Sequence, residues 1–180
     1  MKKLLPYFLL LFLFFTVNAG FDIAPQQTFR PVFMLRSEVE RSITLGSPQS
    51  IKNPGKIYLK DHLIFINEKF RGIHVIDNSD PENPQKRAFI QVDGCIDIAM
   101  KDNVMYADNA VDLIAFKFDE SAGSLEVVKR IRGVFPEPLS PDGRGVSWAE
   151  RQAVPDDAVL VRWERNNKNR YESESESGIR

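Results

Sequence analysis

The chain of 180 residues has little of the chemistry that catalytic and metal sites require, since it contains one cysteine and two histidines. The single cysteine, Cys95, excludes an intramolecular disulfide, and its apolar strand context is typical of a free thiol that acts as a small buried hydrophobe. Neither His62 nor His74 stands in a recognisable catalytic or metal-binding motif, and His74 alternates with apolar residues. We therefore expect His74, which faces away from Ile73 and Val75, to be a satisfied histidine and not a metal ligand, and we expect no metal and no cofactor.

An excess of charge of either sign is also missing. The net charge is −1, and it becomes −3 when Lys2 and Lys3 are removed with the N-terminal segment. A nucleic-acid-binding protein needs a basic stripe to neutralise phosphates, and the one basic cluster, at residues 162–170, is followed at once by a Ser–Glu alternation at 172–177. The sequence therefore predicts no nucleic-acid partner, and it predicts a disordered polar tail at residues 166–180.

Long apolar runs are absent except at the N-terminus, where Leu4 to Val17 follows two lysines. The run is shorter than the about twenty residues of a spanning helix, and it ends in the small-residue pattern Val17-Asn18-Ala19. This pattern predicts a secretory signal peptide at residues 1–19, although a retained anchor is the alternative. No cysteine for lipid attachment follows it. We expect an exported protein, periplasmic, at the cell surface or secreted, without a stable membrane span after cleavage.

What the sequence does contain is short apolar segments separated by turn-forming residues, which is typical of one small β domain. Residues 20–52 form an N-terminal segment, in which the capping-box spacing of Ser37 and Glu40 predicts a short helix from Glu38 to Thr44. Residues 134–165 hold a proline-containing excursion and a last strand, Val159–Trp163. We expect Trp148 and Trp163 to anchor these parts to the core.

The segment between them, residues 53–133, is an internal repeat. Lys60–Phe65 matches Lys101–Tyr106 at an offset of 41, and Gly72–Ile76 meets Asp112–Phe116 at an offset of 40. The repeat divides the segment into unit one, at about residues 53–93, and unit two, at about 94–133. Four short strands are predicted in each: Lys56–Lys60, Leu63–Asn67, Ile73–Asp77 and Ala88–Val92, then Ile96–Lys101, Val104–Asp108, Leu113–Phe118 and Leu125–Ile131.

Four strands in about 40 residues are typical of a propeller blade. The predicted fold is mainly β, with two propeller-blade-like four-stranded antiparallel units and a short N-terminal helix. The stretch Gly72–Pro81 also resembles the LVIVD-repeat family, whose repeat carries an apolar strand, an Asp and a Ser-Asp-Pro turn. Unit two departs from this motif at Lys117 and Asp119–Gly123. The resemblance, to small exported proteins common in Bacteroidota, implies a propeller-like repeat and export, but no reaction, cofactor or catalytic residue.

Two blades are too few to close a propeller, so each unit would leave an apolar face exposed. One solution packs the two sheets against each other, with Val159–Trp163 as an extra strand. Another solution covers the faces with further copies of the chain, as a homo-oligomer. The closed monomer is the preferred prediction, because open sheet edges recruit partners without specificity.

Candidate functional residues lie in the turn between the second and third strand of each unit, which should share one rim. Phe70 and Arg71 are of types enriched at interfaces. Asp108 and Asp112 are two carboxylates that could bind a hard cation or do acid–base work, although the spacing lacks the glycine and glutamate of an EF-hand loop. The candidate binding residues are Glu68, Phe70, Arg71, Asp108, Asn109 and Asp112.

Two functions follow from these candidates. The first is an exported, non-enzymatic module of the cell envelope or secretome that binds an unknown protein or envelope component, or assembles. The alternative is a small metal- or carboxylate-dependent hydrolase that uses Asp108 and Asp112, which would need a further base or ligand that no motif supplies.

Overall fold

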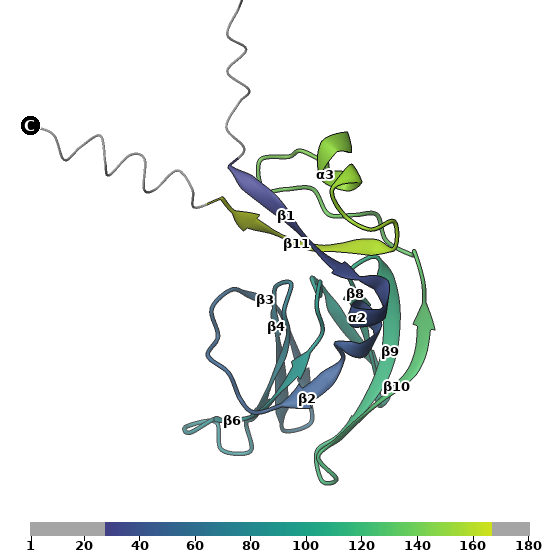
Figure 1. Cartoon of the computed structure of the whole chain (residues 1–180). Coiled ribbons are helices and arrows are strands. Elements are labelled where there is room, and N and C mark those ends of the chain that lie inside the picture. Colours follow the sequence, from purple (N-terminus) through teal and green to yellow (C-terminus); the bar gives the residue numbers. More distant parts are fainter. Residues whose placement is uncertain (1–27, 167–180) are drawn as a thin grey trace, which may run out of the picture.

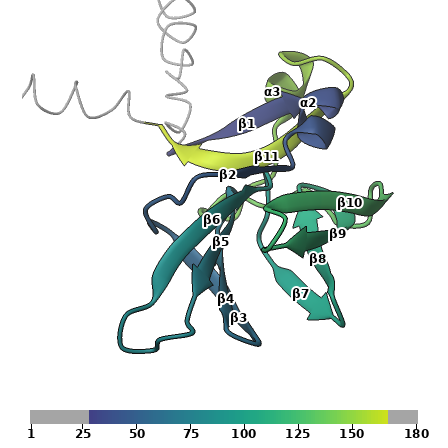
Figure 2. The same cartoon turned by 90° about the horizontal axis from the view of Figure 1, so that it is seen from below.

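The computed structural model describes residues 28–166, and Figures 1 and 2 show that part of the chain as two antiparallel sheets with a two-stranded ribbon across one end of both. Two short helices flank the ribbon. The fold is mainly β, as the sequence predicts. The predicted signal peptide at residues 1–19 lies outside the described residues, and so does all but the first residue of the predicted tail.

Unit one, joined by β2 from the N-terminal segment, forms a five-stranded sheet in the order β2-β6-β5-β4-β3. Its strands are β2 (Thr44–Gly46), β3 (Pro54–Lys60), β4 (Leu63–Glu68), β5 (Gly72–Asp77) and β6 (Gln85–Gln91). The four predicted strands are present, and β6 begins three residues earlier than the apolar pattern indicated. The fifth strand, β2, was not predicted, because three residues with one apolar side chain carry almost no periodic signal.

Unit two forms a four-stranded sheet in the order β10-β9-β8-β7. Its strands are β7 (Ile98–Lys101), β8 (Val104–Asn109), β9 (Asp112–Asp119) and β10 (Ser124–Ile131). The register of the two sheets is equivalent residue for residue: Tyr58 pairs with Phe65 in unit one, and Ala99 pairs with Tyr106 in unit two.

The turns repeat as well. The first turn of each unit holds an aspartate with positive φ, Asp61 at 53° and Asp102 at 55°. The second turn holds Phe70 at 65° and Ala110 at 59°. Left-handed backbone at matching positions is uncommon for residues other than glycine, so the two units share their backbone path as well as their strand order.

The two sheets pack against each other over one apolar core. Unit one contributes Phe65, Val75 and Ile90 among others, and unit two contributes Ile98 and Phe116. Cys95, in the linker between the units, is fully buried in the same core, as its sequence context predicts, and burial raises the pKa of its thiol well above the usual value. A buried thiol with a raised pKa is a poor nucleophile.

The ribbon pairs β1 (Phe29–Leu35) with β11 (Ala158–Arg165) in antiparallel register. The last strand is thus present, but it joins β1 and neither of the two large sheets. The ribbon and helix α2 (Arg36–Arg41) lie over the turn of unit two, where Val39, Val159 and Val161 bury a second small core around Ala110. Strand β1 was missed because its partner follows at the other end of the domain.

Helix α2 begins two residues before and ends three residues before the predicted bounds. The predicted capping box at Ser37 is wrong. Glu38 instead accepts a hydrogen bond from the backbone N–H of Leu35 at 3.0 Å, which places the N-terminus of the helix earlier. The predicted last turn of the helix is lost because Thr44 pairs with Gln91 of β6 at the start of β2.

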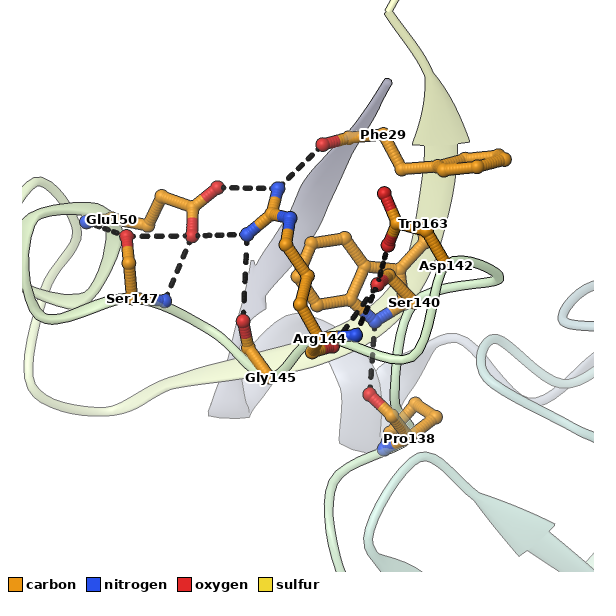
Figure 3. A network of polar contacts seen from close by, with 9 residues as sticks. All are labelled: Phe29, Pro138, Ser140, Asp142, Arg144, Gly145, Ser147, Glu150 and Trp163. Carbon is orange, nitrogen blue, oxygen red and sulfur yellow. Dashed lines mark hydrogen bonds and ion pairs between the residues drawn. The ribbon is translucent and has the colours of Figure 1, made fainter. Parts of the chain in front are cut away.

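The proline-containing excursion is an ordered segment that ends in helix α3 (Trp148–Gln152), and Figure 3 shows the contacts that hold it. The guanidinium of Arg144 donates to both carboxylate oxygens of Glu150, at 2.9 and 3.1 Å, and to the carbonyl oxygen of Phe29. The Arg144 guanidinium, together with hydrogen bonds from Ser147, lowers the pKa of Glu150 to about 2, although burial opposes this effect. The Arg144 guanidinium also stacks over the ring of Trp163, 4.6 Å from its centroid. The excursion is therefore tied to both strands of the ribbon.

The two tryptophans differ in their roles. Trp163 is buried, and its indole N–H donates to the carbonyl oxygen of Pro138 at 2.9 Å, so it anchors the excursion as predicted. Trp148 is 79% exposed at the start of α3, so the prediction that it is an anchor is wrong. Among residues 28–166, no helix is long and apolar enough to cross a membrane.

Candidate functional site

The structure brings the two candidate turns to one place, the linker that joins the units. In unit one, Phe70 donates its N–H to the carbonyl oxygen of Cys95 at 2.6 Å and accepts from Gly94 at 3.0 Å. In unit two, Ala110 lies so close to Gly94 that a Cβ on the glycine would clash with its backbone. Both turns therefore lie at the same rim, as predicted, but their surroundings differ.

The turn of unit one, Lys69–Arg71, opens into a polar hollow of about 670 Å³ at this rim, which we call the rim hollow. Its walls come from three separate parts of the chain: the loop before β3, the turn itself and the end of β11. The lining residues are Pro48, Gln49, Ser50, Lys52, Asn53, Glu68, Lys69, Phe70, Arg71, Arg162, Trp163 and Glu164. Three of the six predicted site residues, Glu68, Phe70 and Arg71, thus share one cavity.

Glu68 builds the wall of the rim hollow. Its carboxylate accepts hydrogen bonds from the backbone N–H groups of Lys52, at 2.9 Å, and Asn53, at 2.5 Å, and lies 2.9 Å from Nε2 of His74. Burial by itself would raise the pKa of Glu68, but these partners outweigh it and lower the pKa. Glu68 therefore fixes the loop before β3, and His74 is a satisfied histidine, as predicted.

Phe70 is held at the rim in an unusual conformation. Its positive φ is costly for an aromatic residue, by about 1–3 kcal/mol, and it persists because both its N–H and its carbonyl are hydrogen-bonded to the linker. The side chain is half-buried and lines the rim hollow. These backbone hydrogen bonds hold the Phe70 ring beside the charged groups of the rim, although the ring is not packed in a buried core.

The charges of the rim hollow are unbalanced. Glu164 is paired with Arg162, whose Nε donates to it at 2.9 Å, and Glu68 is used internally. Within residues 28–166, no ion pair involves the side chains of Lys52, Lys69 or Arg71, and all three residues are exposed. Glu164 also pairs with Arg30, and the charge of Arg71 adds to the effect of Arg162 and Arg30 in lowering the pKa of Glu164. The rim hollow therefore presents three cationic groups to a ligand, and it is suited to bind carboxylates or other anions.

The ribbon covers the turn of unit two, and the polar residues of this turn stabilise the fold. Asp108 accepts hydrogen bonds from the backbone N–H groups of Ile96 and Asp97, both at 2.7 Å. Burial raises the pKa of Asp108 in spite of these hydrogen bonds, and the neighbouring Asp97 charge raises it further. Asp108 thus holds the residues before β7 as Glu68 holds the residues before β3, so the two units share this carboxylate clamp.

Asn109 and Asp112 are fully buried below the ribbon. Asn109 donates from Nδ2 to the carbonyl oxygen of Asp93 at 2.7 Å. Asp112 accepts from Arg36 at 2.7 Å, from Arg130 at 2.7 Å and from the backbone of Gly133. Although burial opposes the effect, these contacts lower the pKa of Asp112. The three polar residues of unit two are therefore engaged in internal contacts and do not line the rim hollow.

Asp108 does line a second cavity, an apolar groove of about 540 Å³ on the outer side of unit two. One wall of the groove is the segment Phe135–Leu139, and the floor includes Ala99, Tyr106 and Leu113. In the described part of the chain, no three of the His, Cys, Asp and Glu residues gather in a group that could hold a metal ion.

Sequence reasoning missed Lys52, Lys69 and Arg162 as parts of the candidate site. Lys69 lies beside Phe70 in the turn that was identified, so its position alone could have included it. Lys52 and Arg162 join the rim hollow only through tertiary contacts, and no local pattern marks either one. Comparison of the chain with protein-family models, with curated proteins and with solved structures finds no match.

Proposed function

We propose that this chain is an exported, non-enzymatic binding module that recognises an acidic segment of a partner protein at the rim hollow. The observation that carries the proposal is the gathering of Lys52, Lys69 and Arg71, without ion partners among the described residues, around the side chain of Phe70. Charged groups around an apolar contact are a common arrangement in protein recognition, where the charges steer the partner and the apolar contact slows its release.

Export and the repeat family belong to the same proposal. Export rests on the apolar N-terminal run before residue 20. The LVIVD-like nature of the repeat rests on the motif in unit one and is supported by the equivalent strand register and the matching left-handed turns of the two units. Loops positioned by a rigid scaffold commonly carry binding residues, which fits a module defined by its rim.

The hydrolase alternative has less support. Its two carboxylates have separate tasks, since Asp108 holds the backbone before β7 and Asp112 lies fully buried between two arginines. Asp108 retains a raised pKa and a place in the apolar groove, which are the two features that favour acid–base work. Neither His62 nor His74, both of which the structure describes, lines that groove. The binding module therefore accounts for more of the geometry.

Fluorescence anisotropy with a labelled decaglutamate peptide tests the proposal. The wild-type protein should bind the peptide, and binding should weaken as salt screens the charges. The double variant Lys69→Glu/Arg71→Glu should lose binding by about tenfold or more, equivalent to about 1.4 kcal/mol. The matched control Lys86→Glu/Lys117→Glu makes the same change of charge outside the rim hollow and should bind as the wild type does.

A second variant separates the aromatic contact from the charges. Phe70→Gly keeps the left-handed backbone and removes the ring, so it should weaken binding without changing its salt dependence. Absence of peptide binding by the wild type, or equal loss in the rim and control variants, contradicts the proposal.

A further inference from the structure

In each unit, one face of the sheet packs against the other unit in the shared core, and the opposite face does not. Unit one turns Tyr58, Phe65, Ile73 and Val75 toward the shared core, and we call this its Tyr58 face. Unit two turns Ile98, Met100, Met105 and Ala107 toward the core, which we call its Met100 face. The opposite sides of the two sheets lie outside this core. They are the Leu59 face of unit one, with Ile57, Leu59, Ile64 and Ile66, and the Ala99 face of unit two, with Ala99, Tyr106, Leu113 and Ala115. Part of each face is already buried within the chain, namely His74, Ile76 and Phe89 on the first and Ala115 on the second, so the exposed apolar residues are Ile57, Leu59 and Ala99.

The repeat relates these four faces in an unexpected way. Because Tyr58 is equivalent to Ala99 and Phe65 to Tyr106, the Tyr58 face of unit one corresponds to the Ala99 face of unit two. Because Leu59 is equivalent to Met100, the Leu59 face corresponds to the Met100 face. The core therefore joins unlike faces, as a rotation about a common axis does, and the two free faces are the counterparts of the two faces already packed together.

The free faces also have the chemistry of an interface. On the Leu59 face, Ile57 is 59% and Leu59 is 68% exposed, and both lie on the open edge strand β3. On the Ala99 face, the apolar groove of about 540 Å³ lies between the sheet and the segment Phe135–Leu139, which leaves Ala99 exposed and gives aliphatic side chains a place to insert. Exposed apolar surfaces of this kind mark interaction sites in soluble proteins.

The charged residues at the junction of the two sheets also alternate in sign from one unit to the next. Lys56 of unit one forms an ion pair with Asp97 of unit two at 2.8 Å, across the junction of the sheets. Lys56 is the third residue of β3 and Asp97 immediately precedes β7, but the two match at the repeat offset of 41, so they carry opposite charges at the same place in the repeat. A copy added to the Ala99 face would bring its own Lys56 toward Asp97, which continues the pattern without like-charge repulsion.

We propose that copies of this chain associate head to tail, with the Leu59 face of one copy on the Ala99 face of the next. Such an interface is heterologous, so it extends until a ring closes. Propellers close with about four to eight blades, which corresponds to about two to four copies of a two-unit chain. The surface lies apart from the rim hollow, so the inference goes beyond the binding proposed above and can fail independently of it.

The first experiment measures the mass of the exported protein by light scattering, with single substitutions on each free face. The wild type should show the mass of a closed assembly of two to four copies, and both Leu59→Glu and Ala99→Glu should reduce it to one copy. Both residues are exposed, so the variants should keep the wild-type circular dichroism. Trp148→Glu, on the exposed helix α3, is the control and should leave the assembly intact.

Mixing the two charged variants gives a sharper result. Each keeps one good face, so an equimolar mixture should form a dimer of one copy of each and nothing larger. A wild-type monomer overturns the proposal. So does an assembly that Leu59→Glu disrupts and Ala99→Glu leaves intact, because that pattern belongs to association through like faces.

Chemical cross-linking provides a second measurement that does not depend on destabilising the interface. The Tyr58 hydroxyl donates to the carbonyl oxygen of Met100 across the core, so these residues are neighbours at the length of a tyrosine side chain, and the equivalent pair between copies is Ala99 and Leu59. The double variant Leu59→Cys/Ala99→Cys should therefore form covalent multimers with a flexible bismaleimide, which spans more than a disulfide can, while neither single variant should. Cross-linking of either single variant, or none in the double variant, contradicts the head-to-tail arrangement. Decaglutamate binding at the rim hollow should be the same in all of these variants.

Discussion

Glu68 in unit one and Asp108 in unit two hold the same part of the repeat, and their environments move their pKa values in opposite directions. Each accepts hydrogen bonds from two successive backbone N–H groups just before the first strand of its unit. Glu68 has His74 as an additional partner, and its pKa is lowered. For Asp108, burial outweighs the hydrogen bonds and the nearby charge of Asp97 adds to it, and its pKa is raised. A repeat thus preserves backbone geometry, while the neighbours of each unit decide its electrostatics.

The turns show the same contrast at a larger scale. The ribbon and helix α2 cover the turn of unit two, which becomes part of a core, whereas the turn of unit one stays open and lines the rim hollow. The turn of unit two therefore stabilises the fold, whereas the turn of unit one forms a surface open to a ligand. The difference arises from the segments outside the repeat, because they pack on one unit only.

The largest effect should come from breaking the anchor that only unit two possesses. Asp112→Ala removes the partner of Arg36 and Arg130 and leaves two partly buried cations, so we expect the free energy of unfolding to fall by about 3–5 kcal/mol. The equivalent position in unit one is Gly72, which has no such anchor. Urea denaturation measures the change, with the exposed turn variant Asp119→Ala as the control, expected to lose less than about 1 kcal/mol. A loss as small as that of the control would show that the ribbon is held in another way.

An intermediate effect, with opposite pH dependence, should distinguish the two carboxylate clamps. The folded pKa of Glu68 lies below the ordinary 4.5, so its contribution to stability is complete above pH 4.5 and is lost as pH falls through the folded pKa. The folded pKa of Asp108 lies above the ordinary 3.8, so stability falls as pH rises from 3.8 through the folded pKa.

Thermal unfolding between pH 3 and pH 7 (about the range in which carboxyl groups titrate) measures both slopes against the variants Glu68→Gln and Asp108→Asn. The advantage of the wild type over Glu68→Gln should grow with pH, and its stability relative to Asp108→Asn should decline. Slopes of the same sign would mean that the two clamps share one environment. If Asp108→Ala instead removed a hydrolytic activity and left stability unchanged, the hydrolase alternative would replace the binding module.

The smallest effect should come from the first turns, where the two units are most alike. Asp61→Gly and Asp102→Gly relieve left-handed backbone at exposed positions, at the cost of a more flexible unfolded chain. Each should raise the free energy of unfolding by less than about 1 kcal/mol, and the two changes should agree within about 0.5 kcal/mol. Guanidinium denaturation of the two variants tests this equality. Unequal changes would mean that the environments of the units differ even at these turns.

Only part of the candidate site could be predicted from the sequence, because several of its residues come together through tertiary contacts. The turn residues Glu68, Phe70 and Arg71 were found because the repeat places them between two strands. Lys52 and Arg162 were missed because a loop and a distant strand bring them there, and the prediction for Trp148 was wrong because an aromatic side chain need not reach a core.

The sequence by itself determined the local parts of this protein: the eight strands of the repeat, their turns, and the burial of Cys95. Alternating apolar residues and turn-forming residues act over a few positions, so a single chain segment carries that information. Only the tertiary structure decided that β1 joins β11, that the ribbon covers one turn and leaves the other open, and which sheet faces remain free. These outcomes depend on contacts between segments far apart in the chain, where the burial of apolar surface selects the partner and no local pattern records it.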